Sequence, residues 1–261
     1  MRVGIIGNGA ISGYVQTQLQ ERGYRIDALL VRSAAAPAKA SSAMPHVESV
    51  DDLPQGIELM IDCAGHGGLQ AHGAEILRRG TDLITVSLGA LADAGLQETL
   101  EAAARSGASR LHLASGAIGA LDCLQAARIG GIDDVTYIGR KPPQGWKGSP
   151  AETIVDLDGM RAGAQTHFSG SAREAAVAYP KNANVAAAVA LAGIGFEQTR
   201  VELIADAEIS TNIHQISAAG AFGNFEFVIN GNPMPDSARS SALAAMSVVS
   251  KLDQLSQPIR F

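Results

Sequence analysis

Over the first 115 residues, two patterns of hydrophobic and polar positions follow each other in turn along the chain. Short apolar runs, typical of buried parallel strands, recur at residues 3–6, 26–31, 59–63, 83–86 and 111–114. Between several of them, apolar side chains recur every three or four residues, as on one face of a helix, and a glycine often follows. Alternating strands and helices predict a parallel sheet with covering helices, which is an N-terminal Rossmann-type α/β domain over residues 1–115.

The pattern changes after the small-residue loop at 115–119. A helix is expected from Ala120 to Ile129, and strand-like segments follow at residues 135–138, 200–204, 213–217 and 225–229. A hairpin across Gly220 to Gly223 would join the last two of these segments. The sequence therefore predicts a second, α+β domain over residues 116–237, with a largely antiparallel sheet.

The C-terminal segment returns to a helical pattern. An apolar stripe runs along residues 240–255, and Ser237 is a candidate N-cap. The stripe consists of Leu243, Met246, Val249 and Leu252. We expect this C-terminal helix to pack back on the first domain, which residues 238–261 would complete.

Composition and charge narrow the function classes. Of the 261 residues, 46% are hydrophobic and 18% charged, which fits a globular protein, and the net charge is −6. No cluster of Lys and Arg indicates a nucleic-acid or membrane partner, and no apolar run approaches the ~20 residues of a membrane span. Cys63 and Cys123 lack a zinc or CxxC spacing, and a strand begins at once without a leader, so we expect a cytoplasmic protein with reduced thiols.

A glycine turn connects the first strand to the first helix. Gly7 allows a tight turn, and Gly9 lets the backbone approach a pyrophosphate. Ala10 and Ile11 open the helix, whose N-terminal N–H groups and partial positive charge suit phosphates. The third glycine of the usual fingerprint is replaced by Ser12, which is still small. This turn predicts a bound dinucleotide, NAD or NADP.

Two later strand ends refine the cofactor prediction. An NAD site usually has Asp or Glu at the end of the second strand, but this chain has Arg32 there, which could hold a 2′-phosphate or simply be solvated. NADP use, or use of both cofactors, follows from the first alternative. At the end of the third strand, Ala64 and Gly65 are small enough to let the cofactor approach the backbone.

Several segments together resemble the L-aspartate dehydrogenase family, in the expected order along essentially the whole chain. They are GNGAI at 7–11, SGAIGALD at 115–122, RKPP at 140–143, YPKNANV at 179–185 and TNIHQI at 211–216. The first is common to many Rossmann enzymes, and the combination is more specific. The resemblance implies oxidation of L-aspartate by NAD or NADP to iminoaspartate. That product hydrolyses to oxaloacetate and ammonia, or enters NAD biosynthesis.

The resemblance also implies site residues and an assembly. His214 would be the active-site residue, Ala117 and Asn184 would contact the cofactor near the nicotinamide, and the protein would be a homodimer or larger, built through the second domain. A histidine suits the reaction, because amine oxidation needs a proton acceptor with a pKa near neutrality. The alternatives are a structural histidine at 214 and an N-cap at Asn184.

A substrate with two carboxylates also needs cationic partners. Lys181 and either Arg140 or Lys141 are the candidates, with surface side chains as the alternative. The sequence shows no metal-ligand cluster, no P-loop and no Ser-His-Asp arrangement. Two other functions stay open: a related Rossmann enzyme acting on another amino acid, a semialdehyde or a cyclic imine, and a non-catalytic NADP-binding sensor.

Overall fold

The computed structural model describes residues 1–33, 44–235 and 237–259. The chain divides into two compact units: unit 1 comprises residues 1–114 and 244–261, and unit 2 comprises residues 115–243. The return to unit 1 therefore comes six residues later than the sequence suggested, because a small hairpin of β12 (Pro233–Met234) and β13 (Ser237–Ser241) stays with unit 2. Ser237 begins β13, so its predicted role as a helix cap is wrong.

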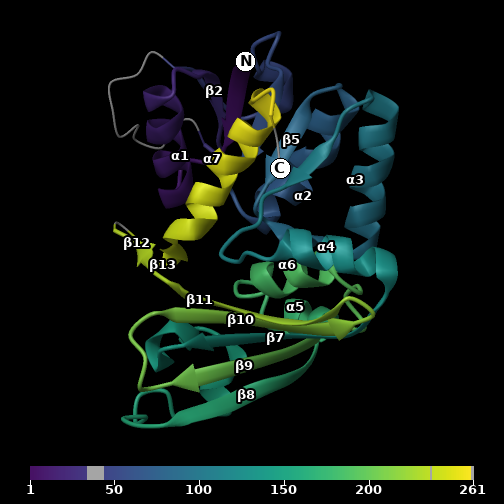
Figure 1. The fold of residues 1–261 in the computed structure, drawn as a ribbon. Coiled ribbons are helices and arrows are strands. Elements are labelled where there is room, and N and C mark those ends of the chain that lie inside the picture. The colour runs from purple at the N-terminus through teal and green to yellow at the C-terminus, as the bar shows by residue number, and fades with distance from the viewer. Residues whose placement is uncertain (34–43, 236, 260–261) are drawn as a thin grey trace. The chain divides into compact units, whose positions relative to one another are not determined.

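Unit 1 is built on a six-stranded parallel sheet of order β3-β2-β1-β4-β5-β6 (Figure 1). Its strands are β1 (Arg2–Ile6), β2 (Arg25–Leu30), β3 (His46–Val47), β4 (Leu59–Asp62), β5 (Asp82–Thr85) and β6 (Leu111–Leu113). Its helices are α1 (Ala10–Glu21), α2 (His66–Arg78), α3 (Ala94–Gly107) and α7 (Ala242–Ser256), with short 3₁₀ turns at Val50–Asp52 and Leu88–Ala92. The Rossmann prediction is confirmed.

The C-terminal helix packs on unit 1, as predicted. Val15 and Leu19 of α1 share one buried cluster with Val248 and Leu252 of α7, against Val3 and Ile5 of β1. The predicted stripe is partly wrong, because Met246 is 45% exposed. The buried face instead follows Ala245, Val248, Val249 and Leu252, which have the i, i+3, i+4, i+7 spacing of one helix face.

Unit 2 is a five-stranded mixed sheet of order β11-β10-β7-β9-β8 (Figure 1). Its strands are β7 (Ile132–Lys141), β8 (Ala164–Ser171), β9 (Arg200–Asp206), β10 (Asn212–Gly220) and β11 (Gly223–Gly231), and only the β7–β9 pair is parallel within the described sheet. Helices α4 (Leu121–Gly130), α5 (Ala172–Ala178) and α6 (Asn184–Ala192) pack on one face, with 3₁₀ turns at Pro143–Trp146 and Pro150–Thr153. The predicted hairpin of β10 and β11 is confirmed.

Besides the β12–β13 hairpin, the strand β8 and the helix α5 of unit 2 were not predicted. The strand β8 has the sequence AQTHFSGS, which lacks an apolar alternation because it lies at the sheet edge. The short helix α5 follows it and begins with a capping box of Ser171 and Glu174, which the sequence shows as S-x-x-E. Among the described residues, no helix combines the length and apolar character that a membrane span requires.

Candidate active site

The Gly7 turn in unit 1 requires glycine for two reasons. Its φ is +94°, a conformation that residues with a Cβ adopt only at a cost. A Cβ at this position would also lie 3.0 Å from the Cα of Ala64, because the loop after β4 passes directly beside the turn. The Gly7 N–H donates to the carbonyl of Leu30 (2.8 Å), which fixes the end of β2 to the same turn.

Open space lies next to Gly9, at the start of α1. A Cβ built on Gly9 would have no neighbour within 4 Å, and this residue caps the helix without a side chain. The first turn of α1, which includes Ala10 and Ile11, contains no acidic residue. A helix N-terminus with these properties offers N–H donors and a partial positive charge to an anion.

Ser12 replaces the third glycine of the fingerprint without crowding the turn. Its side chain is fully buried, and its hydroxyl donates to the carbonyl of Gly7 at 2.7 Å. The substitution therefore adds a hydrogen bond that ties the first turn of α1 to the glycine turn. The altered fingerprint preserves the loop geometry that phosphate binding needs.

A buried carboxylate supports the second loop of this site. Asp62, at the end of β4, accepts hydrogen bonds from the Ala64 N–H (2.9 Å) and from the hydroxyls of Thr85 and Ser87 (both 2.7 Å). Burial raises the pKa of Asp62, although these three donors act in the opposite direction. Gly65 follows with a φ of +78° and caps α2. Asp62 thus holds Ala64 and Gly65 beside Gly7.

In unit 2, His214 lies at the centre of the sheet. It belongs to β10 and pairs with Gly139 of β7, so the two residues share one face of the sheet. His214 is 5% exposed, and its Nδ1 lies 2.8 Å from the hydroxyl of Tyr137, which is also buried. The phenol reaches it by crossing Gly139, where an added Cβ would lie 2.7 Å from the Tyr137 oxygen.

The charge state of His214 follows from its surroundings. Burial, together with the smaller effect of the positive charge of Lys141, lowers the pKa of His214 to about 4. The ring is therefore neutral at pH 7, which is the form able to accept a proton, but its pKa lies below the near-neutral value expected from the sequence. Burial alone raises the pKa of Tyr137, so the phenol stays protonated.

The cationic residues predicted to bind the substrate carboxylates lie in different surroundings. Arg140 follows Gly139 along β7, so it points to the sheet face opposite His214, and its guanidinium donates to Asp206 at 3.0 Å. Lys181 is exposed in the turn between α5 and α6. The structure therefore does not bring Arg140 to His214.

Lys141, the alternative to Arg140, lies on the His214 side of β7. Its ammonium donates to the Asn182 side-chain oxygen at 2.5 Å and lies 4.8 Å from the centre of the Trp146 ring. Lys141 is partly buried, and this burial lowers its pKa to about 8. The Lys141 ammonium can therefore release a proton near neutral pH, and it lies close enough to His214 to lower the pKa of that ring.

A second buried histidine belongs to the same cluster. His167 of β8 is 5% exposed, packs edge-on against Trp146 with ring centres 4.4 Å apart, and places Nδ1 3.1 Å from the Tyr179 hydroxyl. Burial lowers the pKa of His167 to about 4, with Lys141 acting in the same direction. Its Nε2 is buried and has no partner among the residues that the structure describes.

Two further predicted residues, Ala117 and Asn184, belong to unit 2. Ala117 is buried in the loop before α4, directly after Gly116, whose φ is +74°. Asn184 is the first residue of α6, with Ala183 in the capping position, so the alternative that Asn184 is an N-cap is wrong. The roles of both residues as cofactor contacts stay predictions.

Comparisons with known proteins identify the family. A model described as "Aspartate dehydrogenase, C-terminal" matches residues 122–255, and one described as "Homoserine dehydrogenase, NAD binding domain" matches residues 3–114. A relative from Ruegeria pomeroyi named L-aspartate dehydrogenase is 52% identical over 260 residues, which cover 100% of this chain and 94% of the relative. The chain belongs to the aspartate dehydrogenase family.

A second relative and a solved structure also support the assignment of this chain to the aspartate dehydrogenase family. A relative from Ralstonia nicotianae, also named L-aspartate dehydrogenase, is 44% identical and covers 97% of this chain and 96% of its own. The crystal structure of aspartate dehydrogenase from Thermotoga maritima has a TM-score of 0.78 at 27% identity, covering 100% of this chain and 99% of that one. The predicted family resemblance is confirmed.

The residues of unit 1 fit a nicotinamide dinucleotide. The fit rests on the open space at Gly9, the positive φ of Gly7 and the close approach of Ala64. Arg32, predicted to hold a 2′-phosphate, is exposed just after β2. Among the described side chains, no group of three or more His, Cys, Asp or Glu is arranged to hold a metal ion.

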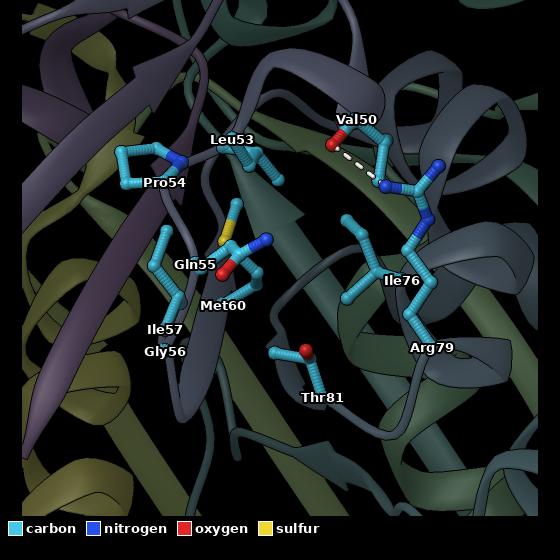
Figure 2. A pocket seen from close by; sticks show the side chains of 10 residues that line it. All are labelled: Val50, Leu53, Pro54, Gln55, Gly56, Ile57, Met60, Ile76, Arg79 and Thr81. Atoms are coloured by element: carbon cyan, nitrogen blue, oxygen red, sulfur yellow. Dashed lines mark hydrogen bonds between the residues drawn. The ribbon is translucent and has the colours of Figure 1, made fainter.

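A pocket of about 250 Å³ lies elsewhere in unit 1 (Figure 2). Its lining includes Ile57 and Met60 at the start of β4 and Thr81 just before β5, so it opens at the amino ends of strands whose carboxyl ends carry the cofactor loops. Arg79, its cation, already donates to the Val50 carbonyl and pairs with Asp51 and Glu75. This pocket contains none of the predicted site residues.

Sequence reasoning missed Tyr137, the hydrogen-bond partner of His214, and the residues that surround Lys141 and His167. Tyr137, Asn182, His167, Tyr179 and Trp146 were not candidates, although Tyr137 and Lys141 have the even spacing that puts them on one strand face. Finding Tyr137 beside His214 requires the register of two strands whose residues are 77 positions apart in the chain. No local motif contains that information.

Proposed function

We propose that this protein is an L-aspartate dehydrogenase that oxidises L-aspartate to iminoaspartate, which then hydrolyses to oxaloacetate and ammonia. One observation carries the proposal: a buried histidine, held neutral and hydrogen-bonded to Tyr137, occupies the sheet of a chain that is 52% identical to a named L-aspartate dehydrogenase. A sensor without catalysis has no use for such a group.

The residues divide the chemistry between the units. Gly7, Gly9 and the first turn of α1 hold the dinucleotide pyrophosphate, and the bound nicotinamide supplies the acceptor for the hydride that leaves the substrate α-carbon. His214 takes a proton from the substrate ammonium at Nε2, so that the nitrogen lone pair can form the C=N bond as the hydride leaves. In this form Nδ1–H donates to the Tyr137 oxygen, which fixes the ring orientation.

After the hydride has left, His214 holds the proton taken from the amine. The protonated ring can return that proton to the departing ammonia when water adds to the imine carbon, and water supplies the carbonyl oxygen of oxaloacetate. The overall change balances: the substrate would lose a hydride to the cofactor, the water oxygen would replace the nitrogen that leaves as ammonia, and the two protons of that water would pass to solvent.

For the cofactor, we propose that the protein accepts NADP as well as NAD through Arg32. The support is the absence of an acidic side chain at residues 30–33, together with the exposure of Arg32 after β2. An Arg32→Ala variant should bind NADP less tightly and NAD with unchanged affinity. Equal loss for both cofactors, or for neither, would contradict this role for Arg32.

For the assembly, we propose a homodimer built through unit 2. The sheet face opposite α4, α5 and α6 bears Ile138, Ile213 and Val228, and Val228 is 46% exposed. Light scattering coupled to gel filtration should give twice the chain mass, and Val228→Lys should shift the distribution toward monomer. The cytoplasmic location and the use of iminoaspartate in NAD biosynthesis stay predictions.

The proposed substrate is tested by a panel of amino acids. L-Aspartate, L-glutamate, L-alanine and aspartate semialdehyde are each added with NAD and then with NADP, and absorbance of the reduced nicotinamide is followed. We expect turnover with L-aspartate to exceed that with each other compound at least tenfold. Preferred turnover of the semialdehyde or of another amino acid would transfer the proposal to a related dehydrogenase.

A further inference from the structure

The cations of unit 2 differ in whether a carboxylate neutralises them. Most of the described Arg and Lys side chains of this unit are exposed or paired, and Lys141 alone among them is partly buried without a carboxylate partner. The ion pairs are Arg140–Asp206, Lys147–Asp158, Arg173–Glu197 and Arg200–Asp134. Among the described residues of unit 2, Lys141 is therefore the partly buried position that keeps an uncompensated positive charge.

The surroundings of Lys141 hold it in place but do not neutralise it. Asn182 contributes one amide oxygen, and the Trp146 ring contributes its electron-rich face. Neither carries a formal charge, and withdrawing an ammonium from water without a counter-charge costs free energy. A protein can carry this free-energy cost at a binding site, because a negatively charged ligand supplies the missing counter-charge when it binds.

His167 provides a second, independent sign of a missing ligand. When the Tyr179 hydroxyl donates to Nδ1, the neutral ring carries its proton on Nε2, and this buried N–H has no acceptor in the described part of the chain. His167 and Lys141 both contact Trp146, and the charge of Lys141 influences the titration of His167. A buried donor and an uncompensated cation thus share one aromatic neighbour.

We infer that Lys141 and the Nε2–H of His167 form a carboxylate-binding subsite, with Asn182 and Trp146 as positioning residues. The inference rests on the proposed function for the identity of its ligand, which is one carboxylate of the dicarboxylic substrate. A carboxylate has two oxygens and can accept from both donors at once. This subsite replaces Arg140 as the predicted substrate anchor.

Occupation of the subsite would also change His214. The positive charge of Lys141 opposes protonation of His214, because like charges repel. A carboxylate bound to Lys141 offsets this charge, so His214 becomes a better proton acceptor when the substrate is in place. The anchor and the base are then coupled through Lys141.

The test uses Trp146, the only tryptophan in the chain, as a reporter inside the subsite. Succinate carries two carboxylates but no amine, so it can occupy the subsite without turnover. We expect succinate, added to the protein in the presence of oxidised cofactor, to change Trp146 fluorescence with a saturable dependence. Sodium chloride and sulfate at equal ionic strength should not reproduce the change, and if they do, the subsite takes any anion and the inference is overturned.

Three variants locate the effect. Lys141→Met should weaken succinate binding and raise the KM for L-aspartate at least tenfold, and His167→Phe should weaken both by a smaller factor. Asn182→Asp places a carboxylate on Lys141 within the same side-chain shape, so it should also weaken succinate binding at least tenfold. Lys147→Met, which breaks an exposed pair with Asp158, is the matched control and should leave both values unchanged.

The outcomes separate this inference from the proposed function. If the wild-type protein oxidises L-aspartate but Lys141→Met and Asn182→Asp keep the wild-type KM and succinate affinity, the subsite is wrong and the function stands. If succinate binds through Lys141 but L-aspartate is not oxidised, the subsite stands and the substrate assignment falls. Circular dichroism checks that each variant is folded, and Asn182→Asp remains decisive if Lys141→Met does not fold.

Discussion

The two units place their polar groups in opposite ways. In unit 1, the buried carboxylate of Asp62 is satisfied by three donors, and the open space for the ligand lies over the backbone at Gly9. In unit 2, the Nε2 of His167 has no partner among the described residues, and Lys141 has no carboxylate. The cofactor site is thus shaped by backbone geometry, whereas the proposed substrate site depends on side chains that a ligand must complete.

The largest expected effect follows from the buried neutral histidines of unit 2. The folded pKa of His214 and of His167 is about 4, below the usual 6.5, so each stabilises the fold fully above pH 6.5 and loses that stabilisation as the pH falls toward 4. The free energy of unfolding should fall by about 1.4 kcal/mol per pH unit for each histidine in this range. Urea unfolding followed by Trp146 fluorescence measures this, because Trp146 lies in the core of unit 2.

A variant assigns the acid sensitivity to one residue. His214→Gln cannot titrate but keeps a side chain that can bond to Tyr137, so the slope of stability with pH between 6.5 and 4 should fall to about half. A slope equal to that of the wild type would show that other groups cause the acid sensitivity.

The next effect concerns the backbone of unit 1. Gly7→Ala puts a Cβ on a residue with a φ of +94° and 3.0 Å from Ala64, so the turn must shift, at a cost of about 1–2 kcal/mol or more. Cofactor affinity, measured by titration with reduced nicotinamide fluorescence, should fall at least tenfold. The control is Gly13→Ala in α1, where an added Cβ meets nothing within 4 Å and affinity should be unchanged. Equal effects at both positions would mean that the turn geometry does not determine binding.

A smaller effect is expected from the hydrogen bond that orients His214. Tyr137→Phe leaves the buried Nδ1 of His214 without its partner, which costs about 1–3 kcal/mol. We expect kcat to fall by about tenfold, with KM for the cofactor unchanged. Tyr24→Phe removes a comparable hydrogen bond, to Asp253 in unit 1, and should leave kcat at the wild-type value. If both variants lose activity equally, the loss reports general destabilisation.

The two sites also differ in how far the sequence predicts them. The turn at Gly7 and the loop at Ala64 and Gly65 were predicted, because glycine and small residues at fixed distances from a strand impose a local backbone geometry. The contact of Tyr137 with His214 could not be predicted, because it depends on strand register and on the missing side chain of Gly139. Local patterns specify the backbone site, and tertiary packing specifies the side-chain site.

The errors of the sequence predictions in unit 2 also arise where tertiary packing, rather than a local pattern, determines the structure. The strand β8 was missed because its polar edge-strand sequence lacks the alternation of a half-buried strand, and His167 was missed with it. Arg140 and Lys141 were left as alternatives because residue type alone does not separate them, whereas the pleat of β7 places Lys141 on the His214 face.

The central claim is that unit 1 binds the cofactor and that His214 of unit 2 serves the chemistry. The most direct test measures cofactor affinity and L-aspartate turnover on one preparation of His214→Ala. We predict that cofactor affinity stays within twofold of the wild type, while kcat falls about 10²- to 10⁴-fold, the usual contribution of a general acid–base group. Turnover at the wild-type rate, or loss of cofactor binding together with turnover, would contradict this division of roles.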